Sequence, residues 1–171
     1  MHSHNLVVHE SALPKGQGWS PMTWQILNGA NRIPITLFEA TATLDAGPIY
    51  LQHIIELKGT ELVEEWRALQ ARATVRLCLE WLDRYAVVSG EASLQQGEGS
   101  HYIRRRPDDS KLDPKRSLAE QFNLLRVVDN HRYPAFAEIE GRCYDLLIRP
   151  RAEVKQSAWP PSFKENDRHL C

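Results

Sequence analysis

The stretch from His9 to Gly29, "HESALPKGQGWSPMTWQILNG", decides how the fold is interpreted. The apolar run Leu6–Val8 in front of it is typical of a central β-strand buried on both faces. Proline and glycine then interrupt the chain, which predicts a loop. In "MTWQILNG" the apolar residues have the spacing of a short helix, and Gly29 is a residue type at which helices typically end. We therefore expect a strand, a loop that begins at His9, and a helix.

Two further strands and a long helix are predicted after this stretch. The segments Ile33–Ala40 and Pro48–Leu57 are rich in β-formers and are separated by a short loop, which favours a hairpin. Pro34 suggests an edge or entry position in the first strand. Thr60 is the expected N-cap of a helix that runs to about Tyr85. This helix carries one apolar stripe, formed by Leu62, Trp66, Leu69, Ala73, Leu77 and Trp81.

The rest of the chain is predicted to hold a smaller unit. Residues 1–90 form the α/β part, 91–116 a polar linker, 117–150 a helix-plus-hairpin subdomain, and 151–171 a flexible tail. Ser117 and Glu120 have the spacing of a capping box before the helix. The hairpin is expected to turn at Glu140 and Gly141.

Composition excludes several classes of protein. The 171 residues are 42% apolar and 25% charged with a formal net charge of −1, the profile of a globular protein without a field that attracts nucleic acid. No apolar run is long enough for a membrane span. Three widely spaced cysteines argue against a disulfide framework or a cysteine metal site and suit a reducing cytoplasm. We expect a cytoplasmic protein with no metal site and no membrane contact.

His9 and Asp45 are the candidate chemical groups. His9 follows a strand, and active sites of open α/β sheets lie beyond the carboxyl ends of strands. Asp45 lies in "LDAG", where a carboxylate near an imidazole would favour its cationic form. Such a pair can stabilise an oxyanion and move a proton during acyl transfer. The alternatives are a structural histidine and a simple turn aspartate.

Both segments resemble the motifs of the 10-formyltetrahydrofolate-dependent formyltransferases. That family includes methionyl-tRNA, glycinamide ribonucleotide and sugar-nucleotide formyltransferases. "HESALPKGQGWSPMTWQILNG" is similar to its His-x-Ser-x-Leu-Pro motif, and "LDAGPI" to its Leu-Asp-x-Gly-x-Ile motif, with the family's separation (45 − 9 = 36 residues). "HYIRRRPDDSKLD" and "YPAF" are similar to the piece that follows the catalytic domain in the tRNA and sugar-nucleotide enzymes. The resemblance covers residues 5–148.

The resemblance implies a fold, a reaction and site residues. The fold would be α/β, the C-terminal portion of a Rossmann-like formyltransferase domain followed by a small α+β, OB-like appendage. The reaction would transfer a formyl group from 10-formyltetrahydrofolate to a primary amine. His9 would stabilise the oxyanion, and Asp45 would orient His9 and assist proton removal. Thr43, Leu44 and Asp45 would contact the folate, while Ser11 and Gly47 shape the two loops.

The acceptor amine and the partners are expected from the same resemblance. An amino-sugar nucleotide is favoured over methionyl-tRNA, because a basic surface for tRNA is not obvious in the sequence. Arg104–Arg106 could bind a phosphate or pair locally with Asp108 and Asp109.

Two departures from the family pattern lead to a third hypothesis, a non-catalytic binding or interaction module. Val7 stands where the family has a catalytic asparagine, two residues before His9. The family's preceding strands have no counterpart in this chain, so it resembles an N-terminally truncated member. Because exposed edges of apolar strands associate, we expect a homo-oligomer or pairing with a separate N-terminal half.

Overall fold

A computed structural model describes residues 3–151 of the chain. The elements follow in the order β1 (Leu6–His9), β2 (Gln17–Gly18), α1 (Pro21–Leu27), β3 (Arg32–Glu39), β4 (Ile49–Glu56), α2 (Val63–Asp83), α3 (Tyr85–Val88), β5 (His101–Tyr102), η1 (Pro107–Ser110), β6 (Lys111–Leu112), α4 (Phe122–Val127), β7 (Ala135–Ile139) and β8 (Arg142–Leu146). The chain therefore has the mixed α/β character that the sequence predicts.

The main sheet has three antiparallel strands in the order β1-β3-β4. The predicted hairpin is confirmed as β3 and β4, with a register shift between Leu37 and Phe38. Ile33, Ile35 and Leu37 of β3 are fully buried and form the centre of the core. This sheet fixes the end of β1, where His9 lies opposite Thr36 of β3.

The prediction that Leu6–Val8 is a central strand buried on both faces is wrong. β1 pairs with β3 on one side, and among residues 3–151 no other strand pairs with it. Leu6, Val7 and Val8 are therefore half-buried. The central strand is β3 instead, although it contains Pro34. The pairing with β1 stops at Thr36, so Pro34 lies near the entry of β3, beyond the end of that ladder.

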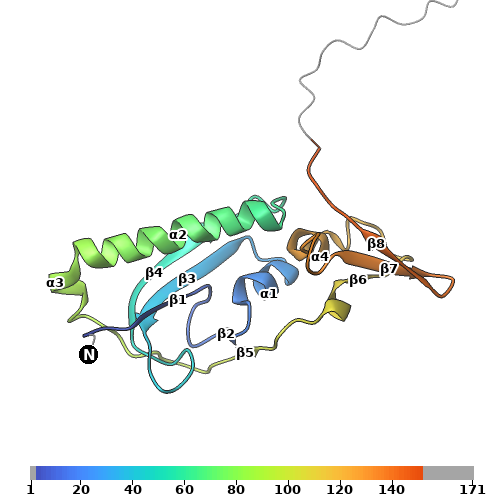
Figure 1. Ribbon diagram of the computed structural model, residues 1–171. Coiled ribbons are helices and arrows are strands. Elements are labelled where there is room, and N and C mark those ends of the chain that lie inside the picture. Colours follow the sequence, from blue (N-terminus) through green and yellow to red (C-terminus); the bar gives the residue numbers. More distant parts are fainter. Residues whose placement is uncertain (1–2, 152–171) are drawn as a thin grey trace, which may run out of the picture.

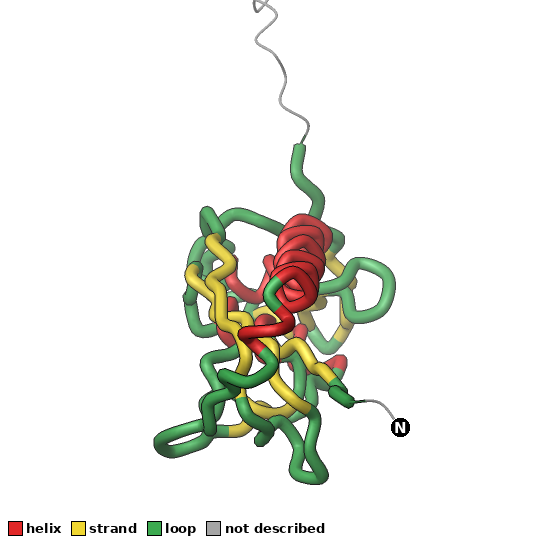
Figure 2. The backbone as a smooth tube through the Cα atoms, turned by 90° about the vertical axis from the view of Figure 1, so that its left-hand side faces the viewer, coloured by secondary structure: helices red, strands yellow, loops and turns green. Residues whose placement is uncertain are grey.

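The long helix α2 packs across β4 and β3 (Figure 1). Figure 2 shows it nearly end-on at one side of the strands. Trp66, Leu77 and Trp81 of its predicted stripe are buried in the core. The expected N-cap at Thr60 is wrong, because α2 begins at Val63 with Leu62 as its cap. The Glu65 carboxylate accepts the Leu62 N–H at 2.8 Å, which satisfies the backbone donor of the cap residue.

A second, smaller sheet is formed by β6, β7 and β8. The predicted hairpin joins β7 to β8, and both Glu140 and Gly141 have positive φ, as a tight two-residue turn requires. Leu112, Leu125, Val128, Ala135 and Ala137 form its core. The predicted capping contacts between Ser117 and Glu120 are present, and the Ser117 N–H donates to Glu120 Oε2 at 2.9 Å. The helix α4 nevertheless begins only at Phe122.

The short helix α4 joins the two cores. Val127 belongs to the core of the main sheet, whereas Leu125 and Val128 belong to the second core. The Trp66 indole N–H of α2 donates to the Arg126 carbonyl at 2.9 Å. The two sheets are therefore connected by packing and by a buried hydrogen bond.

The polar stretch between α3 and β6 lies against the main unit. Figure 1 shows it running along the side away from α2. Gln17 and Gly18 of β2 pair in parallel with His101 and Tyr102 of β5. The division of the chain into 1–90, 91–116 and 117–150 stays a prediction, and the predicted tail lies outside the described residues from position 152 onward. No helix within residues 3–151 is long and apolar enough to cross a membrane.

Candidate active site

His9 is held at the carboxyl end of β1 and is 7% exposed. Its Nε2 lies 2.8 Å from the Gly16 carbonyl oxygen. Because a carbonyl can only accept, Nε2 carries the proton and donates it to Gly16. The loop after β1 therefore folds back over the imidazole and fixes its orientation.

Asp45 lies in the loop between β3 and β4 and is 9% exposed. Its backbone is left-handed, with φ 51°. Its Oδ2 accepts the Gly18 N–H at 2.8 Å and lies 3.9 Å from His9 Nε2. The structure thus brings together two residues that are 36 positions apart, at ion-pair distance rather than in a direct hydrogen bond.

Gly47 and Ser11 are both buried in the loops around this pair. A Cβ on Gly47 would lie 1.6 Å from the Glu39 carbonyl oxygen, so only glycine fits. The Ser11 carbonyl accepts the Thr36 hydroxyl at 2.6 Å. The Ser11 Oγ is buried and finds no hydrogen-bond partner among residues 3–151.

Thr43 and Leu44 lie on the outer surface of the same loop. Thr43 is exposed, and its carbonyl accepts the Thr41 hydroxyl at 3.0 Å. Leu44 is 67% exposed. Both residues are accessible to a ligand, whereas Asp45 beside them points into the protein.

Two glutamines that the sequence analysis did not single out hold the Asp45 loop. The Gln17 side-chain amide donates to the Asp45 carbonyl at 3.0 Å. The Gln95 side-chain amide donates to the same carbonyl at 2.8 Å and to the Gly47 carbonyl at 2.9 Å. Gln95 comes from the predicted linker, and no local pattern in the sequence places it next to Asp45.

The predicted linker also closes over the His9 loop. The Gly16 N–H donates to the Ser100 hydroxyl at 2.9 Å. A Cβ on Gly16 would lie 2.9 Å from the Tyr102 ring, so this ring packs directly on the glycine. Tyr102 also stacks on Trp24 of α1, with ring centroids 6.0 Å apart. The linker is therefore part of the wall of the site.

Val7 occupies the strand position two residues before His9, and side chains at this spacing share one face of a strand. Its side chain is apolar and half-buried. It donates no hydrogen bond to a developing negative charge. The site therefore combines an imidazole N–H and a nearby carboxylate with an apolar side chain at that neighbouring position.

This geometry suits proton handling and charge stabilisation. The Asp45 carboxylate lies 3.9 Å from the imidazole Nε2, close enough to orient it. A buried N–H donor at the end of a strand can stabilise an oxyanion once a substrate replaces the Gly16 carbonyl as its acceptor.

Comparison with known proteins supports the resemblance that the motifs indicate. No family model matches the chain. A methionyl-tRNA formyltransferase of Thermodesulfovibrio yellowstonii is 29% identical over 119 residues, which are 70% of this chain and 39% of that protein. The chain is therefore similar in sequence to the formyltransferases. It spans well under half the length of this curated relative.

Several solved structures share the fold of this chain. A methionyl-tRNA formyltransferase from Clostridium thermocellum matches 89% of this chain and 65% of its own, with a TM-score of 0.71 and 22% identity. A likely sugar N-formyltransferase from Mycobacterium tuberculosis matches 86% of this chain and 66% of its own, at TM-score 0.64 and 21% identity. HypX from Aquifex aeolicus in complex with tetrahydrofolic acid matches 81% of this chain and 24% of its own, at TM-score 0.63 and 16% identity.

Proposed function

We propose that this chain carries the His–Asp part of a formyltransferase site. It would take part in transfer of a formyl group from 10-formyltetrahydrofolate to a primary amine, in the first place an amino-sugar nucleotide. The observation that carries the proposal is the convergence of His9 and Asp45, which lie 3.9 Å apart at the ends of two loops.

The proposed reaction is a direct acyl transfer. The amine nitrogen attacks the formyl carbon and forms the new C–N bond while the carbonyl electrons move to oxygen. In this proposal the His9 Nε2–H donates to that oxygen, while Asp45 orients the imidazole and assists removal of the proton from the amine. As the tetrahedral species collapses, the bond from the formyl carbon to the donor nitrogen breaks, and that nitrogen gains the proton.

The loops that surround the pair are the proposed binding site of the folate-derived donor. The exposed Thr43 and Leu44 are the proposed contacts for its ring system, together with the backbone of Asp45. Ser11 and Gly47 are proposed to shape the two loops that meet there. The buried Ser11 Oγ, which lacks a partner among the described residues, is a polar atom available to a ligand after a small rotation.

The proposal of an amino-sugar acceptor rests on the contacts that the arginines of Arg104–Arg106 make within the chain. Arg105 donates to the Asp109 carbonyl at 2.9 Å, and burial lowers the pKa of Arg105. Arg104 stacks on the Trp19 ring at 5.0 Å. Two of the three arginines are thus engaged within the chain, which leaves fewer free guanidinium groups for a tRNA backbone.

Methionyl-tRNA is the second candidate acceptor. The observation in its favour is the sequence similarity to the Thermodesulfovibrio enzyme. A third candidate is a non-catalytic binding or interaction module, and Val7 favours it, since loss of one oxyanion donor lowers rates by about 10²–10³.

The remaining proposals concern the surroundings of the site. We propose that residues 117–150 are the beginning of an OB-like appendage and that the protein acts in the cytoplasm. The free edge of β1 is a candidate surface for a separate N-terminal half.

A formyl-transfer assay tests the proposed function. The chain is supplied with 10-formyltetrahydrofolate and, in parallel, an amino-sugar nucleotide or methionyl-tRNA. His9→Ala should lower the transfer rate by about 10²–10⁴, as expected for loss of a proton-transfer group. His131→Ala, at an exposed turn, is the matched control and should leave the rate unchanged. Equal rates for wild type and His9→Ala, or no transfer by either, would remove the catalytic proposal.

A further inference from the structure

The outward face of α2 carries a second apolar stripe in addition to the buried one. Ala68, Ala71, Val75, Leu79 and Leu82 follow each other at steps of three and four residues and are all exposed. Val75 is 57% exposed, Leu79 55% and Leu82 62%. We call these five residues the outer stripe. Large side chains in a continuous exposed row are unusual on a surface that faces only water.

The helix is therefore apolar on two sides. Trp66, Leu77 and Trp81 face the core of the main sheet, and the outer stripe faces away from it. A helix with apolar residues on both sides is typically covered on both. Within residues 3–151, α2 packs against β3, β4, α3 and α4, and the side chains of the outer stripe stay exposed.

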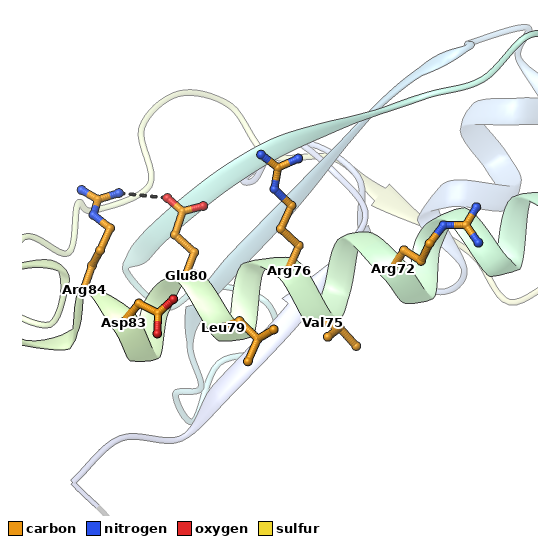
Figure 3. Close-up of a pocket in the computed structure, with 7 residues that line it drawn as sticks. All are labelled: Arg72, Val75, Arg76, Leu79, Glu80, Asp83 and Arg84. Carbon is orange, nitrogen blue, oxygen red and sulfur yellow. Dashed lines mark hydrogen bonds and ion pairs between the residues drawn. The ribbon is translucent and has the colours of Figure 1, made fainter.

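Figure 3 shows the groove along this surface of α2. Val75 and Leu79 point to one side of the helix, whereas Arg76 and Glu80 point to the other. The groove has a volume of about 520 Å³. Glu80 is already paired with Arg84 at 2.9 Å.

Two further charged residues, Arg72 and Asp83, lie beside the outer stripe on the groove side of α2. Arg72 and Asp83 line the groove near its two ends. No ion pair among residues 3–151 includes either of them, nor Arg76, which lies between them on the side of the helix to which Glu80 points. Arg72 and Asp83 are eleven residues apart, about 16 Å along the helix axis, so they are too distant to pair within one helix.

A second copy of the same surface satisfies these charges. If two α2 helices pack antiparallel about a two-fold axis near position 77, Val75 of one copy lies opposite Leu79 of the other. The same arrangement places Arg72 of each copy beside Asp83 of the other copy. A parallel arrangement would instead place Arg72 against Arg72 and Asp83 against Asp83. For Arg72 and Asp83, the charge pattern is therefore self-complementary in the antiparallel sense only.

We propose that the outer stripe of α2 is a homodimer surface that binds the outer stripe of a second copy of this chain in antiparallel orientation. Apolar contact between the two stripes supplies the attraction, and the two Arg72–Asp83 pairs set the orientation. This inference is independent of the proposed formyl transfer, because the outer stripe shares no residue with the His9–Asp45 site.

Two charge reversals test the orientation directly. Arg72→Asp places two aspartates against each other at both contacts, and Asp83→Arg places two arginines there. Each variant alone should have a homodimer dissociation constant at least about tenfold higher than wild type. An equimolar mixture of the two variants should dimerise again, because each contact then joins one arginine and one aspartate. Sedimentation velocity with one variant fluorescently labelled measures both results.

A third variant tests the apolar contact. Leu79→Glu introduces a charge at the centre of the stripe and should yield monomers, with thermal unfolding close to that of wild type because the position is exposed. Glu91→Leu, at an exposed site beyond α3, is the control and should not shift the equilibrium.

Each outcome decides the proposal. Monomeric wild type at micromolar concentration overturns it. So does a dimer that survives Leu79→Glu, which would point to another surface such as the free edge of β1. Single reversals that stay monomeric when mixed contradict the antiparallel pairing. Loss of dimer in each single variant and recovery in the mixture supports it.

Discussion

Gly47→Ala is the substitution whose effect follows most directly from the geometry. The added methyl group would lie 1.6 Å from the Glu39 carbonyl oxygen, where contacts shorter than 3.0 Å are not tolerated. The two backbone segments must therefore separate by about 1.4 Å (3.0 − 1.6), and both belong to the backbone, so no flexible side chain can yield. The same two segments are joined by a hydrogen bond from the Glu39 N–H to the Pro48 carbonyl at 3.0 Å, which such a separation would break.

The expected cost combines two effects. Overpacking of this kind costs about 1–3 kcal/mol, and loss of the Glu39–Pro48 hydrogen bond costs about 1 kcal/mol. The free energy of unfolding should fall by about 2–4 kcal/mol, which lowers the melting temperature by roughly 4–15 °C for a chain of this size. A shift of about 1 Å at Asp45, two residues away, should also lower formyl transfer by about 10².

Thermal unfolding followed by circular dichroism measures the stability effect. Gly90→Ala is the matched control, because the nearest atom to its new Cβ is the Val87 carbonyl oxygen at 3.7 Å, an ordinary contact. Its melting temperature should stay within a few degrees of wild type. Equal melting temperatures for Gly47→Ala and Gly90→Ala would refute the close approach of the Asp45 loop to Glu39.

Three further predictions concern the surroundings of the site. Val7→Asn should raise formyl transfer by about 10²–10³ if the missing oxyanion donor limits the rate, and an unchanged rate in a folded variant would contradict this. Gln95→Leu removes two hydrogen bonds to loop carbonyls and should lower the free energy of unfolding by about 1–3 kcal/mol, whereas Gln96→Leu, exposed beside it, should not. Burial raises the pKa of Tyr50 to about 12, together with the hydrogen bond that Tyr50 donates to Glu39 and the negative charge of Glu39. The stability that this raised pKa contributes is complete below pH 10 and is lost as the pH rises through about 12. Glu39→Gln should therefore lower the midpoint of the Tyr50 transition in an ultraviolet titration.

Local patterns predicted most of the main unit. The β-rich runs and their short loop located the β3–β4 hairpin, because a two-strand pattern with a tight connection needs no information from elsewhere in the chain. The spacing of Trp66, Leu77 and Trp81 located the buried face of α2 for the same reason. The quoted motifs also selected His9 and Asp45, whose convergence depends on the pairing of β1 with β3.

Long-range features could not be predicted in this way. The apolar run at Leu6–Val8 has the composition of a central strand, but its burial depends on how many strands lie beside it. Gln95 reaches the Asp45 loop because the polar linker folds back along β2, and nothing in its local sequence indicates that path. Helix α2 begins at Val63 rather than directly after Thr60, and the Glu65 carboxylate accepts the Leu62 N–H there. The local sequence did not decide between these two starting points.

The most direct test of the central claim is a double-mutant cycle in kcat/KM for formyl transfer, with His9→Ala, Asp45→Asn and the two combined. If the imidazole and the carboxylate work as one unit, each single change removes most of the activity and the double variant is little worse than His9→Ala alone. Losses that multiply, or a full rate in Asp45→Asn, would show that the 3.9 Å approach of these groups has no part in the chemistry.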